Sequence, residues 1–73
     1  MALNVNIPVW KDSQGNVVAC VEKLKVMQEN LEELAQLAQD ALEDAVLMGC
    51  DEDQVKDFLV QVMQSLHNPY QGR

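Results

Sequence analysis

Apolar residues recur with the period of an α-helix from about residue 21 to residue 48. The spacings alternate between three and four residues, which is the heptad pattern of a helix with one apolar seam. The seam consists of Cys20, Leu24, Met27, Leu31, Leu34, Ala38, Ala41, Ala45 and Met48. Gly49 follows it, and glycine readily adopts the left-handed conformation that closes a helix. We therefore predict a long helix over residues 21–48.

A second, shorter helix is predicted at about residues 52–67. Asp51 can cap its first amides, and Gln54 stands three residues later, as in a capping box. One apolar face follows, made of Val55, Phe58, Leu59, Val62, Met63 and Leu66. Asn68-Pro69 ends the pattern, because a residue before proline is disfavoured in helical geometry. Residues 68–73 are then expected to form a tail.

The N-terminal segment has a period of two instead. Leu3, Val5, Ile7 and Val9 alternate with Asn4, Asn6 and Pro8, which is typical of a strand with one buried face. The turn-forming sequence KDSQGN follows, and then a stretch rich in valine. The simplest interpretation is a β-hairpin in which residues 5–11 pair with about 16–20. The alternative is a helix that begins at Val17 with Asn16 as its cap.

Together these elements predict a mainly α fold in which a short N-terminal β-hairpin precedes an antiparallel helical hairpin. We interpret residues 1–73 as a single small domain, with a strand and turn segment at 1–20, the helical hairpin at 21–67 and the tail at 68–73. A chain of 73 residues buries a limited fraction of its surface, so its stability alone is marginal.

The two helices differ in length, and this difference predicts a further interface. A helix of about 16 residues spans roughly 24 Å, whereas one of about 28 spans roughly 42 Å. Folded back from Gly49, the shorter helix reaches only to about residues 34–36. It would place Phe58, Leu59, Val62 and Met63 over the alanines at 38, 41 and 45.

Large side chains beyond that reach need another cover, because soluble monomers seldom expose a contiguous apolar patch. Leu24, Met27, Leu31 and Leu34 are these side chains. The N-terminal segment is one candidate cover and a second copy of the chain is the other. We expect both to contribute in a homodimer, with an interface formed by Leu24, Met27, Leu31, Leu34, Val5, Ile7, Val9 and Trp10.

Charge narrows the range of partners. The formal net charge is −7, and nine acidic residues but no basic residue lie between Met27 and Val55. Such a surface repels phosphate backbones and anionic lipids, so we expect no binding to nucleic acid or membranes. A basic protein is a possible partner, although solubility alone also explains this acidity.

No residue pattern indicates catalysis or a cofactor. Cys20 and Cys50 lie at opposite ends of the long predicted helix, too far apart for a disulfide. His67, the single histidine, is expected to cap the last turn of the second helix. The opening residues lack a secretion signal, so we expect a cytoplasmic protein with free thiols.

Three hypotheses for function follow from these patterns. The first is a non-enzymatic interaction module, a small acidic self-associating helical hairpin that acts as a subunit or adaptor. The second is an acidic charge mimic that inhibits a nucleic-acid-binding protein. The third is a metal-binding protein that uses the carboxylates of the long helix, although the Glu-x-x-His pattern of di-metal bundles is missing.

Overall fold

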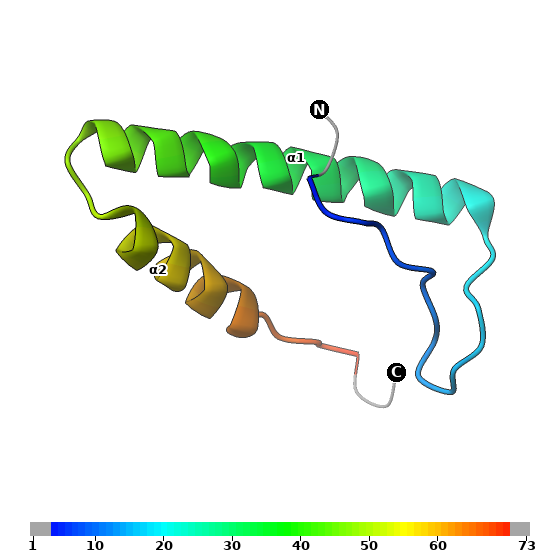
Figure 1. The fold of residues 1–73 in the computed structure, drawn as a ribbon. Helices are drawn as coiled ribbons and strands as arrows, with labels where there is room; N and C mark the ends of the chain where they lie inside the picture. The colour runs from blue at the N-terminus through cyan, green and yellow to red at the C-terminus, as the bar shows by residue number, and fades with distance from the viewer. Residues whose placement is uncertain (1–3, 71–73) are drawn as a thin grey trace. The chain divides into compact units, whose positions relative to one another are not determined.

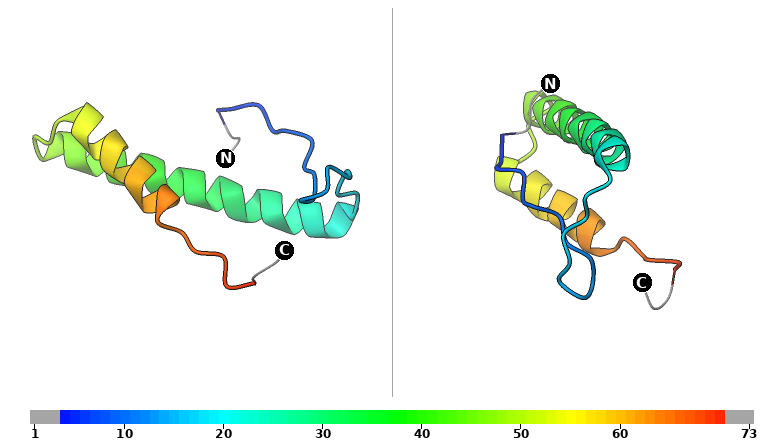
Figure 2. Two further views of the ribbon diagram at one scale, coloured as in Figure 1. Left: turned by 90° about the horizontal axis from the view of Figure 1, so that it is seen from below. Right: turned by 90° about the vertical axis from the view of Figure 1, so that its right-hand side faces the viewer.

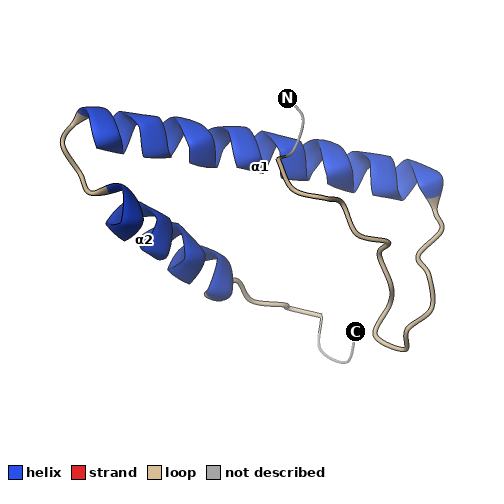
Figure 3. Ribbon diagram, viewed as in Figure 1, coloured by secondary structure: helices blue, strands red, loops and turns tan. Residues whose placement is uncertain are grey.

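The computed structural model describes residues 4–70 and contains two α-helices, α1 (Val21–Leu47) and α2 (Glu52–Gln64) (Figures 1 and 3). The chain divides within α1 into two units, Met1–Gln36 and Leu37–Arg73, and each is described by itself. The expectations for Leu3 and for residues 71–73 lie outside the described residues. The mainly helical prediction is confirmed, with both helices starting where the sequence places them.

In the C-terminal unit, a glycine-dependent turn ends α1 and reverses the chain. Gly49 has a φ of +97°, the left-handed conformation that the sequence predicts for it. The amide of Cys50 donates to the carbonyl of Ala45 at 2.9 Å, and the amide of Gly49 donates to Val46 at 3.0 Å. These two bonds are those of a Schellman motif, which satisfies carbonyls that the end of a helix leaves free. α2 then returns beside residues 37–47 in an antiparallel-like arrangement (Figures 1 and 2).

Asp51 caps α2 as predicted. Its backbone is extended, and its carboxylate accepts a 2.9 Å hydrogen bond from the amide of Gln54. Glu52 and Asp53 occupy the first turn, where the helix dipole favours negative charge. Within residues 4–70, the reciprocal bond from the Gln54 side chain to the Asp51 amide is not formed. The cap is therefore one half of the predicted capping box.

α2 ends at Gln64, three residues earlier than predicted. The Ser65 hydroxyl donates to the carbonyl of Val62 at 2.7 Å, and the Ser65 amide is shared between the carbonyls of Gln61 and Val62. A side chain that bonds the backbone in this way competes with continued helix. His67 consequently lies beyond the helix, and its predicted role at the last turn of α2 is wrong.

Packing within the C-terminal unit is looser than the sequence suggests. Val55, Leu59 and Val62 of α2 are half-buried, as are Ala38, Leu42 and Ala45 of α1. Phe58 contributes less than predicted, because its side chain is 63% exposed, and Met63 is 39% exposed. Ala41 is also exposed. The covered line of α1 thus runs through Leu42 rather than through Ala41.

The N-terminal unit has a turn but no β-hairpin, so that part of the predicted fold is wrong. The turn follows the predicted KDSQGN sequence: Gly15 has a φ of +86°, and its amide donates to the carbonyl of Asp12 at 3.1 Å. The Asp12 carboxylate also accepts from the amides of Gln14 and Asn16, both at 2.9 Å. Beyond the turn, pairing among the described residues is limited to one bridge between Lys11 and Val17.

Proline and the start of α1 explain why the pairing stops there. The amide of Val18 donates to the carbonyl of Trp10 at 2.9 Å, so the next hydrogen-bonded pair in this register would join Pro8 and Cys20. Pro8 has no amide hydrogen to donate. The carbonyl of Cys20 instead accepts the first helical bond of α1, from Leu24 at 3.0 Å. The same bond places the start of α1 at Val21, so the alternative helix start at Val17 is also wrong.

Candidate protein interaction surface

All eight residues predicted to form an interface belong to the N-terminal unit. Four of them lie on α1 at spacings of three and four residues, which places them on one face of the helix. Leu24, Met27 and Leu31 are half-buried, and Leu34 is 39% exposed. Their own unit therefore covers these side chains in part, and each keeps apolar surface in contact with water.

The other four residues lie on the segment that precedes the turn, and all of them are exposed. Val5 and Val9 are 73% and 69% exposed, and Ile7 and Trp10 are 46% and 36% exposed. The polar residues between them are exposed as well. The segment therefore has no buried face, which agrees with the lack of a strand there.

None of the residues 4–70 is buried in this chain. The most enclosed side chains are half-buried, and they form lines along α1 and α2 rather than a shared interior. Folded domains normally enclose several large apolar side chains completely, since burying each contributes roughly 1.5–3 kcal/mol to stability. The described part of the chain lacks this contribution.

The structure also exposes large apolar side chains that the interface prediction did not include. Leu37 is 67% exposed and Met48 is 82% exposed. With Ala41, which is also exposed, they lie in the C-terminal unit at spacings of four and seven residues, beside the half-buried line of Ala38, Leu42 and Ala45. The signal for Leu37 was already in the sequence, because it widens the heptad seam.

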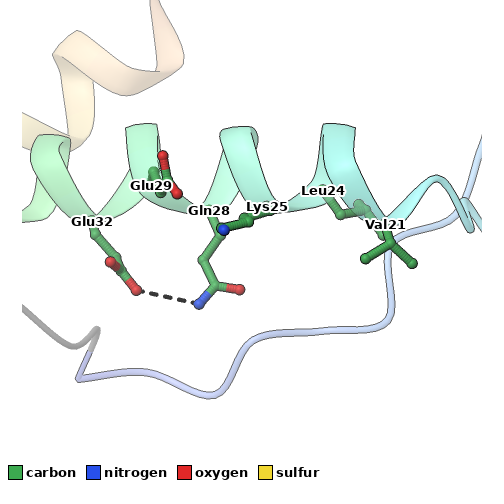
Figure 4. A pocket seen from close by; sticks show the side chains of 6 residues that line it. All are labelled: Val21, Leu24, Lys25, Gln28, Glu29 and Glu32. Carbon is green, nitrogen blue, oxygen red and sulfur yellow. Dashed lines mark hydrogen bonds between the residues drawn. The ribbon is translucent and has the colours of Figure 1, made fainter.

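A groove of about 470 Å³ runs along the N-terminal part of α1 (Figure 4). It is lined by Val21, Leu24, Lys25, Gln28, Glu29 and Glu32. A second groove of about 370 Å³ lies in the C-terminal unit, lined by Leu42, Glu43, Val46, Leu47 and Glu52. Both sets of lining residues combine apolar side chains with carboxylates, and Lys25 is the single basic residue among them.

Neighbouring amides and carboxylates organise part of the acidic surface of α1. The Gln28 side chain donates to Glu32 at 3.2 Å, and Gln39 donates to Glu43 at 2.8 Å (Figure 4 for the first pair). Both pairs are four residues apart, the spacing that brings side chains together on a helix. These bonds orient carboxylates without neutralising them, so the surface keeps its negative charge.

An ion pair is formed on α2. The Lys56 ammonium lies 2.8 Å from the Glu52 carboxylate, one turn earlier. The hydrogen bond and the charge of Glu52 raise the pKa of Lys56 above its ordinary value. Both side chains are more than half exposed, so this pair contributes little to stability.

The described residues offer no group of three or more His, Cys, Asp or Glu side chains that could hold a metal ion. The structure therefore gives no support to the predicted metal site on the carboxylates of α1. Cys20 and Cys50 are both exposed and carry free thiols. In residues 4–70, no helix combines the length and apolar character needed to cross a bilayer.

The chain matches no family model, and no characterised protein or solved structure is significantly similar to it.

Proposed function

We propose that this chain is a non-enzymatic interaction subunit, a small acidic helical hairpin that self-associates through the apolar surface of α1. The lack of any buried side chain among residues 4–70 carries this proposal. A stable fold must offset the conformational entropy lost on folding, mainly by removing apolar surface from water. A second copy of the chain supplies the missing burial.

The exposed apolar side chains support this reading. Val5, Leu37, Leu47 and Met48 are each 67% exposed or more. An obligate homodimer typically buries about 2,000 Å² or more of total surface, enough to cover side chains of this kind. Such interfaces are also more apolar than transient ones, as the exposed valines, leucines and methionines require.

Sedimentation equilibrium over a range of protein concentrations tests the proposal. We expect a mass of twice 8.2 kDa, or a higher multiple, at micromolar concentration. Circular dichroism on the same samples should show helix content falling on dilution, because association and folding are linked. A monomer that keeps its helix content at the lowest concentrations would exclude the proposal.

A basic partner protein is the second candidate, favoured by the exposed carboxylates of α1. Glu29, Glu33 and Asp44 are all exposed, and no basic residue lies between Met27 and Val55. Binding of this kind should weaken steeply with salt, because it depends on attraction between exposed charges. Titration with a basic protein such as a histone, at low and high salt, tests it. Absent or salt-independent binding would remove this candidate, including its form as an inhibitory charge mimic.

The free, exposed thiols of Cys20 and Cys50 support the cytoplasmic location that we propose for the chain.

A further inference from the structure

We infer that two copies of this chain pair edge to edge through residues 5–9, as an antiparallel β-ribbon centred on Ile7. This inference rests on the proposed self-association and adds a second contact, outside α1. Two short strands alone are marginally stable in water, so the ribbon depends on the association of α1 as well. All the residues that form it lie in the N-terminal unit.

The turn at residues 12–16 determines which edge of the preceding segment is free. The amide of Val18 donates to the carbonyl of Trp10 at 2.9 Å, so the backbone groups of Trp10 face the chain's own valine-rich stretch. We call this the inner edge. Successive residues of an extended chain direct their backbone groups to opposite edges, so those of Val9 face the other side, the outer edge.

Proline interrupts the inner edge and leaves the outer edge intact. Pro8, which has no amide hydrogen, falls on the inner edge together with Trp10. Val5, Ile7 and Val9 fall on the outer edge, and in residues 4–70 their backbone groups have no hydrogen-bond partner. The proline that follows Ile7 favours an extended backbone there. The chain bends at residues 4 and 5, so Val5 has to straighten when the ribbon forms.

The outer edge is complementary to itself in the antiparallel direction. With Ile7 opposite Ile7 of the second copy, Val5 of each copy lies opposite Val9 of the other. These side chains share one face of the strand, and cross-strand pairs of β-branched residues stabilise a ribbon. In the single chain they are 46–73% exposed. A parallel pair would place Lys11 beside Lys11, and parallel ladders are less stable per residue.

Charge favours a second copy as the occupant of this edge. The chain has a net charge of −7, but residues 4–10 contain no ionisable side chain. Two copies can therefore approach each other here without repulsion between like charges. A basic partner protein would gain no ion pair along the same residues.

An NMR experiment on the full-length chain tests the register directly. In the ribbon, Asn6 of one copy and Pro8 of the other form a non-hydrogen-bonded pair, with Cα atoms about 4.5 Å apart. Labelled and unlabelled chains are unfolded together, refolded as an equimolar mixture and studied at a concentration where sedimentation shows a dimer. We expect an isotope-filtered NOE between the Hα of Asn6 in one copy and the Hα of Pro8 in the other.

The possible outcomes separate the ribbon from the proposed function. A sedimenting dimer without the NOE between Asn6 and Pro8 would overturn the ribbon and leave self-association through α1 standing. An intermolecular NOE between Val9 and Val9 would overturn the antiparallel orientation, because these residues are roughly 13 Å apart along an antiparallel ribbon. A monomer at every concentration would overturn the proposed function, and the ribbon with it.

A backbone variant gives a second readout without changing any side chain. N-methylation of the Ile7 amide is accessible by ligating a synthetic peptide thioester of residues 1–19 to Cys20 of the remaining chain. It removes one outer-edge donor from each copy, so the dissociation constant should rise by about tenfold or more. N-methylation of the Asn6 amide is the matched control, since this amide lies on the inner edge. Equal dissociation constants for the two variants would contradict the ribbon.

Discussion

The amide of Cys50 reaches back five residues to the carbonyl of Ala45, at 2.9 Å, and this bond closes the last turn of α1. It requires the residue between the two helices to adopt a left-handed backbone, and Gly49 does so with a φ of +97°. A Cβ atom added at Gly49 would meet no heavy atom within 4 Å outside Gly49 and its two chain neighbours. Glycine is therefore required at this position by the backbone conformation and not by steric contact with neighbouring atoms.

Gly49→Ala should destabilise the helical hairpin by about 1–2 kcal/mol, the cost of a left-handed backbone for a residue with a Cβ atom. Urea unfolding followed by circular dichroism, at one fixed protein concentration, measures the loss. Gly49→Asn is the control and should lose less, because asparagine tolerates this conformation better. Equal stability of the alanine variant and the wild type would contradict the role assigned to Gly49.

Asp51→Ala should lower the free energy of unfolding by about 1 kcal/mol, because it removes the acceptor for the amide of Gln54. Asp51→Ser should restore most of the loss, since a hydroxyl can accept the same bond. Asp53→Ala removes an equal charge from the first turn without removing the cap, and it should cost less. If both alanine variants lost the same free energy of unfolding, the loss in Asp51→Ala could not be assigned to the missing cap.

The turn at residues 12–16 should loosen in acid. The amide of Asn16 above all, with those of Gln14 and Gly15, holds the pKa of Asp12 below its ordinary value. Because the folded pKa is depressed, this contribution is present above the ordinary carboxylate range and is lost as pH falls through the lowered pKa. Amide chemical shifts of Gln14 and Asn16, followed by NMR through acidic pH, should report the change.

Asp12→Asn is the control for that titration, since its side-chain oxygen still accepts hydrogen bonds but has no proton to gain. Its amide shifts at residues 14 and 16 should stay constant over the same range. A wild-type transition that persists in this variant would assign the pH dependence to another group.

Leu34→Gln should weaken self-association on the order of a hundredfold, because an apolar side chain of the proposed interface is lost from both copies. Val46→Gln is the matched control. It is also on α1 and has similar exposure, 45% against 39% for Leu34, but it lies off the seam. Sedimentation equilibrium gives both dissociation constants. A larger effect at residue 46 than at residue 34 would move the interface to another face of α1.

The parts of the fold that the sequence predicted correctly depend on short-range chemistry. The heptad spacing, Gly49 and Asp51 each act within a few residues, and each appears in the structure where expected. The end of α2 was placed too late because Leu66 continues the apolar period, whereas the competing Ser65 hydroxyl gives no periodic signal. A small polar residue within an apolar pattern leaves such an end ambiguous.

The predicted β-hairpin does not form, and the reason involves two residues that are far apart in the sequence, Pro8 and Cys20. Alternating apolar residues and a turn sequence are both present, but the register places Pro8 opposite Cys20, whose carbonyl α1 already uses. Only the register reveals this conflict. The predicted interface stays a prediction, and the exposure of Leu37 and Met48, which lie outside it, depends on how α2 lies against the C-terminal part of α1.

If the proposed self-association supplies the enclosed interior that residues 4–70 lack, the amount of protein becomes a determinant of structure. Folding that is completed by a second copy has a midpoint of thermal denaturation that rises with concentration. Newly made copies would remain sensitive to proteolysis until they met a partner, so degradation would clear the chain when its synthesis is low. Expression level would then decide whether this protein exists in folded form at all.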